Sequence, residues 1–414
     1  MALKHSREQT DLLTEINQDL PKDVDWKRGA MEYMGQQIEE QGASAERYHL
    51  IKPFEGGPKF DHFYVNMHKL PNLLEKLDLP MRSSFLDVAC GPGWLSHYLG
   101  KLGHTVLGFD ISDKMIEIAK RRMAADPFPP YPEAPFDVSF FVHDIEDAPL
   151  SVETLFDAAV LESCLHHFYD PVAALENVAR NLKPEGLIAI IEGVAPEACS
   201  CCRKDDLEIM DKYRTLERPY TKKQMIRLLR LTGFEYHEFY YPINGFFAQT
   251  PEAANSVKDR ILNGREWNLI IASKSLERMK QLSETFARFC ETGDKFRYAQ
   301  GFYGEETGPE GLKFRWSGAE SSITISNVDE MEFVIESHLP RIAGRQQEVF
   351  IYIDNVLSER LALSTQQEAV TVLLNRLIDN SRIDFLSDSV FSPRWYGEED
   401  ERMLSFMLRV VSVK

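Results

Sequence analysis

The spacing of hydrophobic positions changes twice along the chain, near residues 84 and 295. Before residue 84, apolar side chains recur at helical intervals. This pattern predicts helices over Gln9–Leu20, Trp26–Gln41 and Phe60–Leu79, with Pro71 as a break or a new start. Residues 1–80 are therefore expected to form an N-terminal helical cap.

From Ser84 onward, short apolar runs alternate with amphipathic helices, one of which opens at a Thr221-x-x-Gln224 capping box. Such alternation implies a parallel sheet covered by helices on both faces, so an α/β domain is expected over residues 81–274. The seven expected strands are Ser84–Ala89, Thr105–Phe109, Val138–Val142, Phe156–Leu161, Leu187–Glu192, Glu235–Tyr241 and Asn268–Ser273.

Beyond a helical connector at residues 275–294, strand-like runs are short and many are separated by turn residues. Regular spacing of this kind predicts an antiparallel β-sandwich over residues 295–414. The expected strands are Leu312–Trp316, Ser322–Ser326, Glu332–Ser337, Val349–Asp354, Val356–Leu363, Ala369–Asn375, Ile383–Ser387 and Met403–Val413.

Composition limits the classes of protein that fit this pattern. The 414 residues include 47 Lys and Arg against 65 Asp and Glu, a formal charge of −18. Because phosphate neutralisation needs basic residues, no nucleic-acid partner is expected. No apolar run approaches the roughly 18 residues of a membrane span, so no integral membrane segment is expected either. The 6 cysteines are too few for a disulfide scaffold, and a cytoplasmic location is predicted.

A cysteine-rich stretch raises the question of a metal site. Cys199 and Cys202 have the C-x-x-C spacing of zinc ligands, but the sequence contains no second pair. We therefore predict no metal from the sequence.

The most informative segment is the glycine turn after the first expected strand. Gly91 and Gly93 allow a ligand to approach bare backbone at a helix N-terminus, and Asp110 closes the next strand, where an acid can bind ribose hydroxyls. The turn departs from the dinucleotide fingerprint, because Ser96 replaces the third glycine and Asp87 lies inside the strand. A carboxylate there would repel a pyrophosphate and attract a cationic ligand.

These residues resemble the first two motifs of class I S-adenosylmethionine-dependent methyltransferases, and three further segments resemble later motifs in the same order. The resemblance covers about residues 50–275 and implies a Rossmann-like seven-stranded sheet, with the N-terminal helices as a lid over the cofactor. The five segments are Phe85–Gly93, Val106–Ser112, Phe141–Ile145, Phe156–His167 and Leu182–Glu192.

The resemblance also implies a set of residues that bind S-adenosylmethionine. Gly91 and Gly93, with Ala89 and Cys90 in the same turn, would lie against the methionine part, and Asp87 would hold its ammonium. Asp110 would bind the ribose hydroxyls and Ile111 would flank the adenine. Asp144, otherwise a turn or cap acid, would accept a hydrogen bond from the adenine amino group beside Ile145, and the backbone of Glu162 would form a rim.

Two adjacent histidines are the candidate catalytic residues. His166 and His167 follow the fourth expected strand, at the sheet edge where ligands bind. An O–H nucleophile benefits from a base of near-neutral pKa, which histidine supplies. Both could instead shape the loop beneath the cofactor. Between the two, we expect His166 to face the acceptor and His167 to be structural.

The acceptor is predicted mainly from the C-terminal region. Aromatic residues lie beside arginine in Phe314-Arg315-Trp316 and Pro393-Arg394-Trp395, an arrangement suited to stacking on sugar rings, although sandwich core is an alternative. The region loosely resembles β-sandwich modules of bacterial glycan-processing enzymes. We therefore expect O-methylation of a saccharide or glycoconjugate. The alternatives are a lipid-like, natural-product or protein acceptor, a nicotinamide-dependent oxidoreductase, or a silent cofactor-binding fold that presents the sandwich. The sandwich could also mediate homo-oligomerisation.

Overall fold

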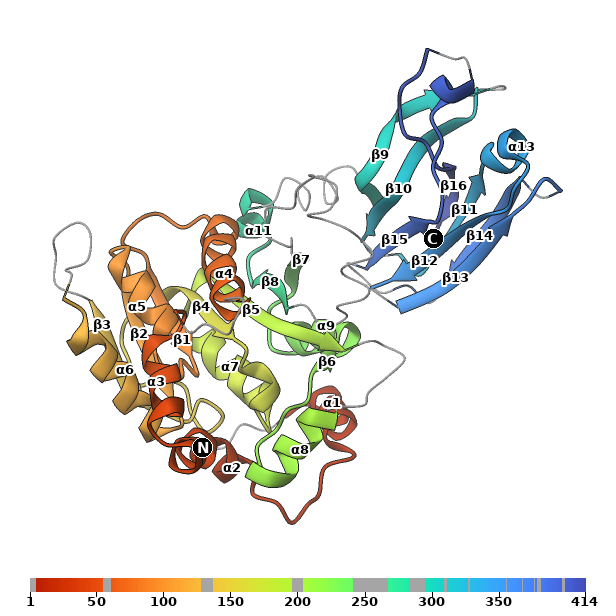
Figure 1. Cartoon of the computed structure of the whole chain (residues 1–414). Helices are drawn as coiled ribbons and strands as arrows, with labels where there is room; N and C mark the ends of the chain where they lie inside the picture. Colours follow the sequence, from red (N-terminus) through yellow and green to blue (C-terminus); the bar gives the residue numbers. More distant parts are fainter. Residues whose placement is uncertain are drawn as a thin grey trace. The chain divides into compact units, whose positions relative to one another are not determined.

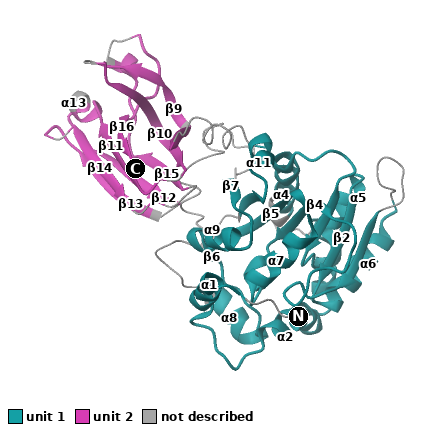
Figure 2. Ribbon diagram, turned by 180° about the vertical axis from the view of Figure 1, so that it is seen from behind, with its two compact units in different colours: residues 1–246, 265–284 teal, residues 247–264, 285–414 magenta. Residues whose placement is uncertain are grey.

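The structure is a computed structural model. It describes residues 5–54, 61–127, 137–195, 204–240, 267–282, 295–308, 311–326, 328–354, 356–366, 368–375, 377, 381–396 and 399–414. Cys199 and Cys202 lie outside these ranges. The chain divides into two compact units, residues 1–246 with 265–284, and residues 247–264 with 285–414 (Figure 2).

A mixed sheet forms the centre of the first unit (Figure 1). Its strands follow the order β3-β2-β1-β4-β5-β8-β7, and the short strand β6 pairs with the end of β5. The prediction of a seven-stranded Rossmann-like sheet is confirmed. The strands are β1 (Ser84–Val88), β2 (Thr105–Asp110), β3 (Val138–Val142), β4 (Phe156–Glu162), β5 (Leu182–Ala195), β6 (Tyr220–Thr221), β7 (Tyr236–Tyr240) and β8 (Trp267–Ser273).

The sheet departs from the expected all-parallel arrangement at one strand. Strands β1 to β5 are parallel, whereas β8 runs antiparallel to both of its neighbours, β5 and β7. The chain passes from β1 outward through β2 to β3 and then returns to β4, which pairs with β1 on its other side. The direction in which strands are added to the sheet therefore reverses beside β1. Ligands bind at the carboxyl ends of the strands beside such a switch point, so this topology fixes where the site lies.

Helices cover the sheet, and their apolar stripes explain where they pack. Leu12, Val172 and Met225, from three different helices, are fully buried in one cluster with strand residues. The helices of this unit are α1 (Arg7–Asn17), α2 (Trp26–Gln41), α3 (Ala43–Ile51), α4 (Asp61–Leu77), α5 (Trp94–Lys101), α6 (Asp113–Ala125), α7 (Pro171–Asn181), α8 (Lys204–Tyr213), α9 (Lys222–Leu231) and α11 (Leu276–Leu282), with the short 3₁₀ helix η1 (Leu165–His167).

The predicted capping box and the predicted proline break had different outcomes. Thr221 and Gln224 form the expected reciprocal cap at the start of α9. Pro71, by contrast, lies inside the continuous helix α4. Leu73 and Leu77, beyond the proline, are fully buried. Their burial favours continuation of the helix and offsets the roughly 3 kcal/mol that an interior proline costs.

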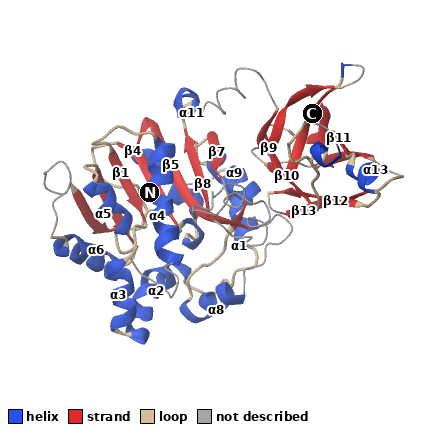
Figure 3. Cartoon of the chain, turned by 45° about the horizontal axis from the view of Figure 1, so that its top comes forward, coloured by secondary structure: helices blue, strands red, loops and turns tan. Residues whose placement is uncertain are grey.

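The second unit is all-β and antiparallel, as expected (Figure 3). Its described strands are hydrogen-bonded in one path, β13-β12-β15-β10-β16-β11-β14, with β9 paired to β10, rather than in two separate sheets. The strands are β9 (Phe296–Thr307), β10 (Lys313–Ile325), β11 (Glu330–Glu336), β12 (Gln347–Ile353), β13 (Val356–Leu363), β14 (Ala369–Asn375), β15 (Arg382–Ser387) and β16 (Met407–Val413), with a short helix α13 (Leu339–Ala343) and a 3₁₀ helix η4 (Pro393–Tyr396).

Alternating burial in this unit shows how the strand pattern builds its core. In β11 every second residue is buried, and Met331, Phe333 and Ile335 are fully enclosed. This period of two is the pattern of a strand with one face on a core. Among the described helices of the whole chain, none is long and apolar enough to cross a membrane.

Candidate functional site

A cavity of about 260 Å³ opens at the carboxyl ends of β1, β2 and β4. Helices α2 and α3 contribute part of its wall, including Tyr33 and His49. Nine of the twelve residues expected from the sequence line this cavity: Ala89, Cys90, Gly91, Asp110, Ile111, Asp144, Ile145, Glu162 and His167. Asp87, Gly93 and His166 do not.

Asp110 is bound to the glycine turn through its backbone. One oxygen, Oδ2, accepts a hydrogen bond from Gly91 N at 2.9 Å, and Oδ1 accepts one from Ser112 N at 2.8 Å. Burial raises the pKa of Asp110, and these backbone donors oppose the rise. Each oxygen keeps a second lone pair, so the carboxylate can still accept two hydroxyl hydrogen bonds from a ribose.

The glycines of the turn serve different purposes. Gly91 has φ +51°, and a Cβ added there would meet no atom within 4 Å, so its open face is available to a ligand. Gly93 has φ +68°, and its Cβ would lie 2.8 Å from both Ala119 and Phe140. The predicted contact of Gly93 with the cofactor is therefore not what the geometry indicates, because packing of α6 and β3 against the turn accounts for this glycine.

Asp87 and Ser96 are hydrogen-bonded partners, and together they explain the two departures from the dinucleotide fingerprint. Asp87 Oδ2 accepts hydrogen bonds from Ser96 N at 3.0 Å and from Ser96 Oγ at 2.6 Å. The carboxyl is buried beneath the turn, off the cavity wall, and burial raises its pKa to about 7. Contact of this carboxyl with a cofactor ammonium, directly or through water, stays a prediction.

Asp144 is held by the lid. Its Oδ2 lies 2.6 Å from Lys27 Nζ of α2, and its Oδ1 accepts a hydrogen bond from Glu146 N at 2.9 Å. The same lysine lies 2.7 Å from Asp147 Oδ1. Asp144 thus lines the cavity, as expected from the sequence. It also accepts a backbone hydrogen bond in its own turn, which fits the alternative prediction of a turn acid.

Glu162 was expected to contribute its backbone to the rim of the methionine pocket, but its side chain also makes specific contacts. Its side chain is only 8% exposed and forms ion pairs with Lys69 and, at 3.6 Å, with Lys52. Trp94 Nε1 donates to Glu162 Oε2 at 3.3 Å, and Lys52 Nζ lies 5.6 Å from the Trp94 ring centroid. Although burial alone would raise the pKa of Glu162, the two lysines lower it well below its usual range. Lys52 and Glu162 therefore line the cavity, and Lys69 adds a second cation in contact with this carboxylate.

The structure reverses the expected division between the two histidines. His167 lines the cavity, and its Nδ1 lies 2.5 Å from the backbone oxygen of Leu216. Since a carbonyl only accepts, Nδ1 carries the proton and Nε2 is left as an acceptor. His166 is off the cavity wall, with Nδ1 2.8 Å from Glu192 Oε2 and Nε2 3.4 Å from Glu217 Oε2.

The electrostatic surroundings separate the two rings further. Burial lowers the pKa of both, but Glu192 and Glu217 raise the pKa of His166 to about 10. For His167, burial and the neighbouring His166 lower the pKa to about 4. At neutral pH His166 is therefore charged and cannot act as a base, whereas His167 is neutral with a lone pair available.

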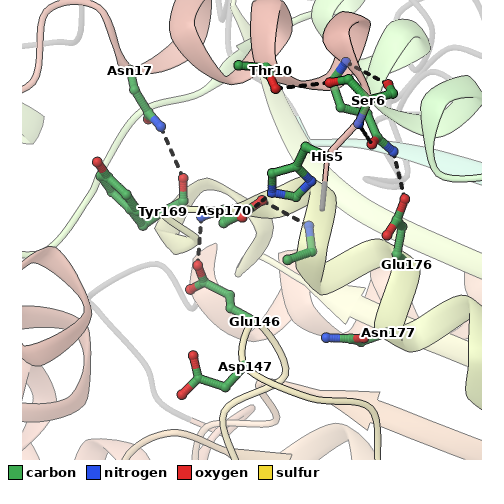
Figure 4. A network of polar contacts seen from close by, with 12 residues as sticks. His5, Ser6, Thr10, Asn17, Glu146, Asp147, Tyr169, Asp170, Glu176 and Asn177 are labelled. Carbon is green, nitrogen blue, oxygen red and sulfur yellow. Dashed lines mark hydrogen bonds and ion pairs between the residues drawn. The ribbon is translucent and has the colours of Figure 1, made fainter. Parts of the chain in front are cut away.

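A polar network ties the N-terminus to the same cavity (Figure 4). His5 Nε2 lies 2.7 Å from Asp170 Oδ2, and Asp170 N donates to Glu146 Oε2 at 2.6 Å. Gln9 Nε2 donates to Glu176 Oε1 at 2.6 Å. Because Glu146 is a cavity residue, docking of α1 is coupled by direct contacts to the cavity wall.

Several site residues were not predicted from the sequence. Lys27, Lys52 and Lys69 lie in N-terminal helices or turns far along the chain from their partners, and nothing in their local sequence marks them. Glu192 had a usable signal. It ends the expected strand Leu187–Glu192, which pairs with β4, the strand before His166, so both residues could be placed at the same sheet edge.

Comparisons with known proteins agree with the position of this site. Residues 86–190 match the family model described as a methyltransferase domain. A ubiquinone biosynthesis O-methyltransferase of Xanthomonas oryzae pv. oryzae is 30% identical over 130 residues, 31% of this chain and 51% of that protein. A demethylmenaquinone methyltransferase of Clavibacter sepedonicus is 35% identical over 112 residues, 27% of this chain and 41% of that protein. The chain thus spans about half the length of the curated relatives it matches.

Among solved structures, phosphoethanolamine N-methyltransferase 2 of Haemonchus contortus, in complex with S-adenosyl-L-methionine, is similar with a TM-score of 0.43 and 18% identity. The similarity covers 62% of this chain and 61% of that one. The family match includes the glycine turn and Asp110 at the cavity. Residues 86–190 are therefore similar to a methyltransferase domain, in line with the sequence resemblance to class I S-adenosylmethionine-dependent methyltransferases.

Proposed function

We propose that this chain transfers a methyl group from S-adenosylmethionine to a hydroxyl oxygen of a small-molecule acceptor that binds beside His167. When bound, S-adenosylmethionine supplies a methyl carbon on a positively charged sulfur. The acceptor oxygen forms a bond to that carbon as the carbon–sulfur bond breaks, and the hydroxyl proton must leave. The protein's task is to align the two reactants, exclude water and accept the proton.

The residues of the cavity fit the cofactor. Gly91 offers an open backbone surface, and Asp110 can accept the ribose hydroxyls. The two lysines beside Glu162 supply positive charge suited to a carboxylate such as that of the methionine part. Lid contacts through Lys27 would close the cavity over a bound ligand and keep water out.

The observation that carries the proposal is the tautomer of His167. Its Nδ1–H is committed to Leu216 O, so the ring is fixed with Nε2 as a hydrogen-bond acceptor in a residue that lines the cavity. A neutral imidazole in this state can accept a hydrogen bond from an acceptor hydroxyl and take its proton. His166, held between two glutamates, would instead orient this loop.

The acceptor class is suggested by the other side chains near His167. Tyr33, Met34 and Phe168 line the same cavity, so much of this wall is apolar or aromatic. Such a wall favours a hydroxyl carried on a flat apolar ring, and the relatives include proteins named ubiquinone biosynthesis O-methyltransferase and demethylmenaquinone methyltransferase. The saccharide acceptor expected from the sequence stays a prediction, to be tested beside the ring acceptor.

Transfer of a labelled methyl group tests the proposal. Full-length protein is incubated with methyl-labelled S-adenosylmethionine and separate cell fractions of apolar lipids, glycans and proteins. Label is expected in a ring-bearing compound of the lipid fraction, in a base-stable ether linkage. Label only in glycans would support the saccharide prediction instead. Bound cofactor without transfer to any fraction would support the silent fold.

A further inference from the structure

We infer that His166, His167 and Glu217 form a binding site for one divalent transition-metal ion at the edge of the methyl-transfer cavity. One ligand atom from each residue lies within 4.8 Å of the other two. His166 and His167 come from η1 after β4, and Glu217 comes from the segment between α8 and β6. Three residues from two distant parts of the chain are thus brought together by the fold.

The distances suit a metal of ordinary size. His166 Nε2 and Glu217 Oε2 are 3.4 Å apart. Two ligands at about 2.0–2.1 Å from a tetrahedral zinc ion are roughly 3.3 Å apart, so this pair is already spaced for coordination. One nitrogen of His167 lies within 4.8 Å of the other two ligand atoms, so a short movement of this ring would complete the set.

The hydrogen bonds behind the two rings are those that metal-binding histidines make. His166 Nδ1 lies 2.8 Å from the carboxylate of Glu192, and His167 Nδ1 lies 2.5 Å from the carbonyl oxygen of Leu216. Such partners fix the orientation of each ring. This support is independent of the ligand spacing, because neither Glu192 nor Leu216 belongs to the ligand set. His166 Nε2 faces Glu217, and the ion would replace the proton between them, as metal binding by histidine requires.

The ligand types indicate which ions would bind. Two imidazoles and one carboxylate suit Zn²⁺, Co²⁺, Mn²⁺ or Fe²⁺, whereas Mg²⁺ and Ca²⁺ prefer sites made entirely of oxygen. Three protein ligands leave a position open for an exogenous oxygen. His167 and Thr215 both line the cavity, and Thr215 Oγ1 is buried without a hydrogen-bond partner in the described structure.

The ion would have a role in the proposed reaction, and only this role rests on the proposed function. A metal-bound hydroxyl has a lower pKa than a free one, so an ion at this place would bind the acceptor oxygen and favour loss of its proton to solvent water before the methyl group is transferred. His167 Nε2 then acts as a ligand in the metal-bound protein, and as the proton acceptor only when the ion is absent. If the ion takes part in the reaction, the rate of methyl transfer should depend on the metal. If His167 is the proton acceptor, the rate should not depend on the metal.

Titration of the chelator-treated, full-length protein with Co²⁺ tests the site. We expect one ion per chain and visible absorption typical of nitrogen and oxygen ligands. Glu217→Gln should weaken Co²⁺ binding at least tenfold, and Glu192→Gln, behind the ring, should weaken it by about tenfold. Glu117→Gln, an exposed acid of α6, is the matched control and should bind as the wild type does.

Each outcome bears on the inference separately from the methyl-transfer proposal. Absence of Co²⁺ binding to the wild type, or equal binding to Glu217→Gln, overturns the metal site. Calorimetric binding of S-adenosylhomocysteine, measured on the same samples, shows whether each variant is folded and whether the cofactor site is intact. Cofactor binding without Co²⁺ binding would leave the proposed function standing and remove only the ion.

Discussion

Lys27 Nζ lies 2.6 Å from Asp144 Oδ2, which joins helix α2 of the lid to the loop after β3 at the cavity wall. Both side chains are partly shielded, with 29% and 21% of their surfaces exposed. An ion pair of this kind contributes up to about 1 kcal/mol. Breaking the contact therefore costs up to about 1 kcal/mol, or about fivefold in an equilibrium constant.

We expect Lys27→Gln to speed dissociation of S-adenosylmethionine by up to about fivefold, because 1 kcal/mol corresponds to that factor. Stopped-flow fluorescence can follow release, since Trp94 lines the cavity. Arg28→Gln is the control, because Arg28 pairs within α2 with Glu32. Equal rates for the two variants would show that the Lys27–Asp144 pair does not hold the lid.

Asp110→Ala should weaken S-adenosylmethionine binding at least tenfold, or about 1.4 kcal/mol. The substitution removes the proposed ribose acceptor and also frees the backbone N–H groups of Gly91 and Ser112. Isothermal calorimetry measures the affinity, and Asp113→Ala, on the exposed first turn of α6, serves as the control. An unchanged affinity for Asp110→Ala would remove Asp110 from the site.

His167→Gln should lower kcat by about a hundredfold, the lower range of general acid–base contributions, with little change in cofactor affinity. His338→Gln, in the second unit, is the control. Steady-state rates with the acceptor found by methyl labelling provide the measurement. A fall in cofactor affinity with kcat unchanged would mean that His167 only shapes the cavity.

Asp87 gives a prediction for the pH dependence of stability. Burial raises its pKa from the model-compound value of 3.8 to about 7 in the folded protein. The folded state therefore favours the protonated carboxyl. Its stabilising contribution is complete below pH 3.8 and is lost as the pH rises through 7. The Asp87→Asn variant does not lose this contribution. The difference between its unfolding free energy and that of the wild type should therefore shift in favour of the variant from pH 4 to pH 7.

Denaturant unfolding at several pH values measures this difference. Asp157→Asn is an informative comparison, because the pKa of Asp157 is lowered by Lys183 and Ser84 despite the opposing effect of burial. The contribution of Asp157 to the unfolding free energy has the opposite pH dependence and is lost as the pH falls. If the wild type and Asp87→Asn respond identically to pH, Asp87 does not titrate in this range.

The parts of the fold governed by local pattern were predictable from the sequence. Strands such as Val138–Val142 were found at their exact bounds because apolar runs between turn residues mark buried strands. Strand β9, Phe296–Thr307, was missed because its glycines and acids interrupt the apolar pattern. Strand β8 was found, but its antiparallel direction depends on pairing between segments far apart in sequence.

Site residues were likewise predictable where their position depends on local pattern, and not where it depends on distant segments. Residues at strand ends, such as Asp110 and His167, could be placed at the cavity because a parallel sheet brings strand ends to one edge. The orientation of neighbouring side chains could not be predicted from the sequence. Adjacent His166 and His167 differ in their environments because of Glu192, Leu216 and Glu217, which lie 26 or more residues away.

Gly91 and Gly93 lie two residues apart and should respond differently to substitution by alanine. Both have positive φ, which costs an alanine about 1 kcal/mol. At Gly93 the new Cβ would also lie 2.8 Å from Ala119 and Phe140, so overpacking adds about 1–3 kcal/mol. At Gly91 it would meet nothing within 4 Å, but it would stand on the cavity wall.

We therefore expect Gly93→Ala to lower the unfolding free energy by about 2–4 kcal/mol. Gly91→Ala should lower it by about 1 kcal/mol and weaken cofactor binding at least tenfold. Denaturant unfolding and calorimetry on both variants measure the two effects. Gly35→Ala, at a helical position with no neighbour within 4 Å, is the control for stability. Loss of cofactor affinity in Gly93→Ala without loss of stability would contradict the assignment, because it would place Gly93, and not Gly91, against the ligand.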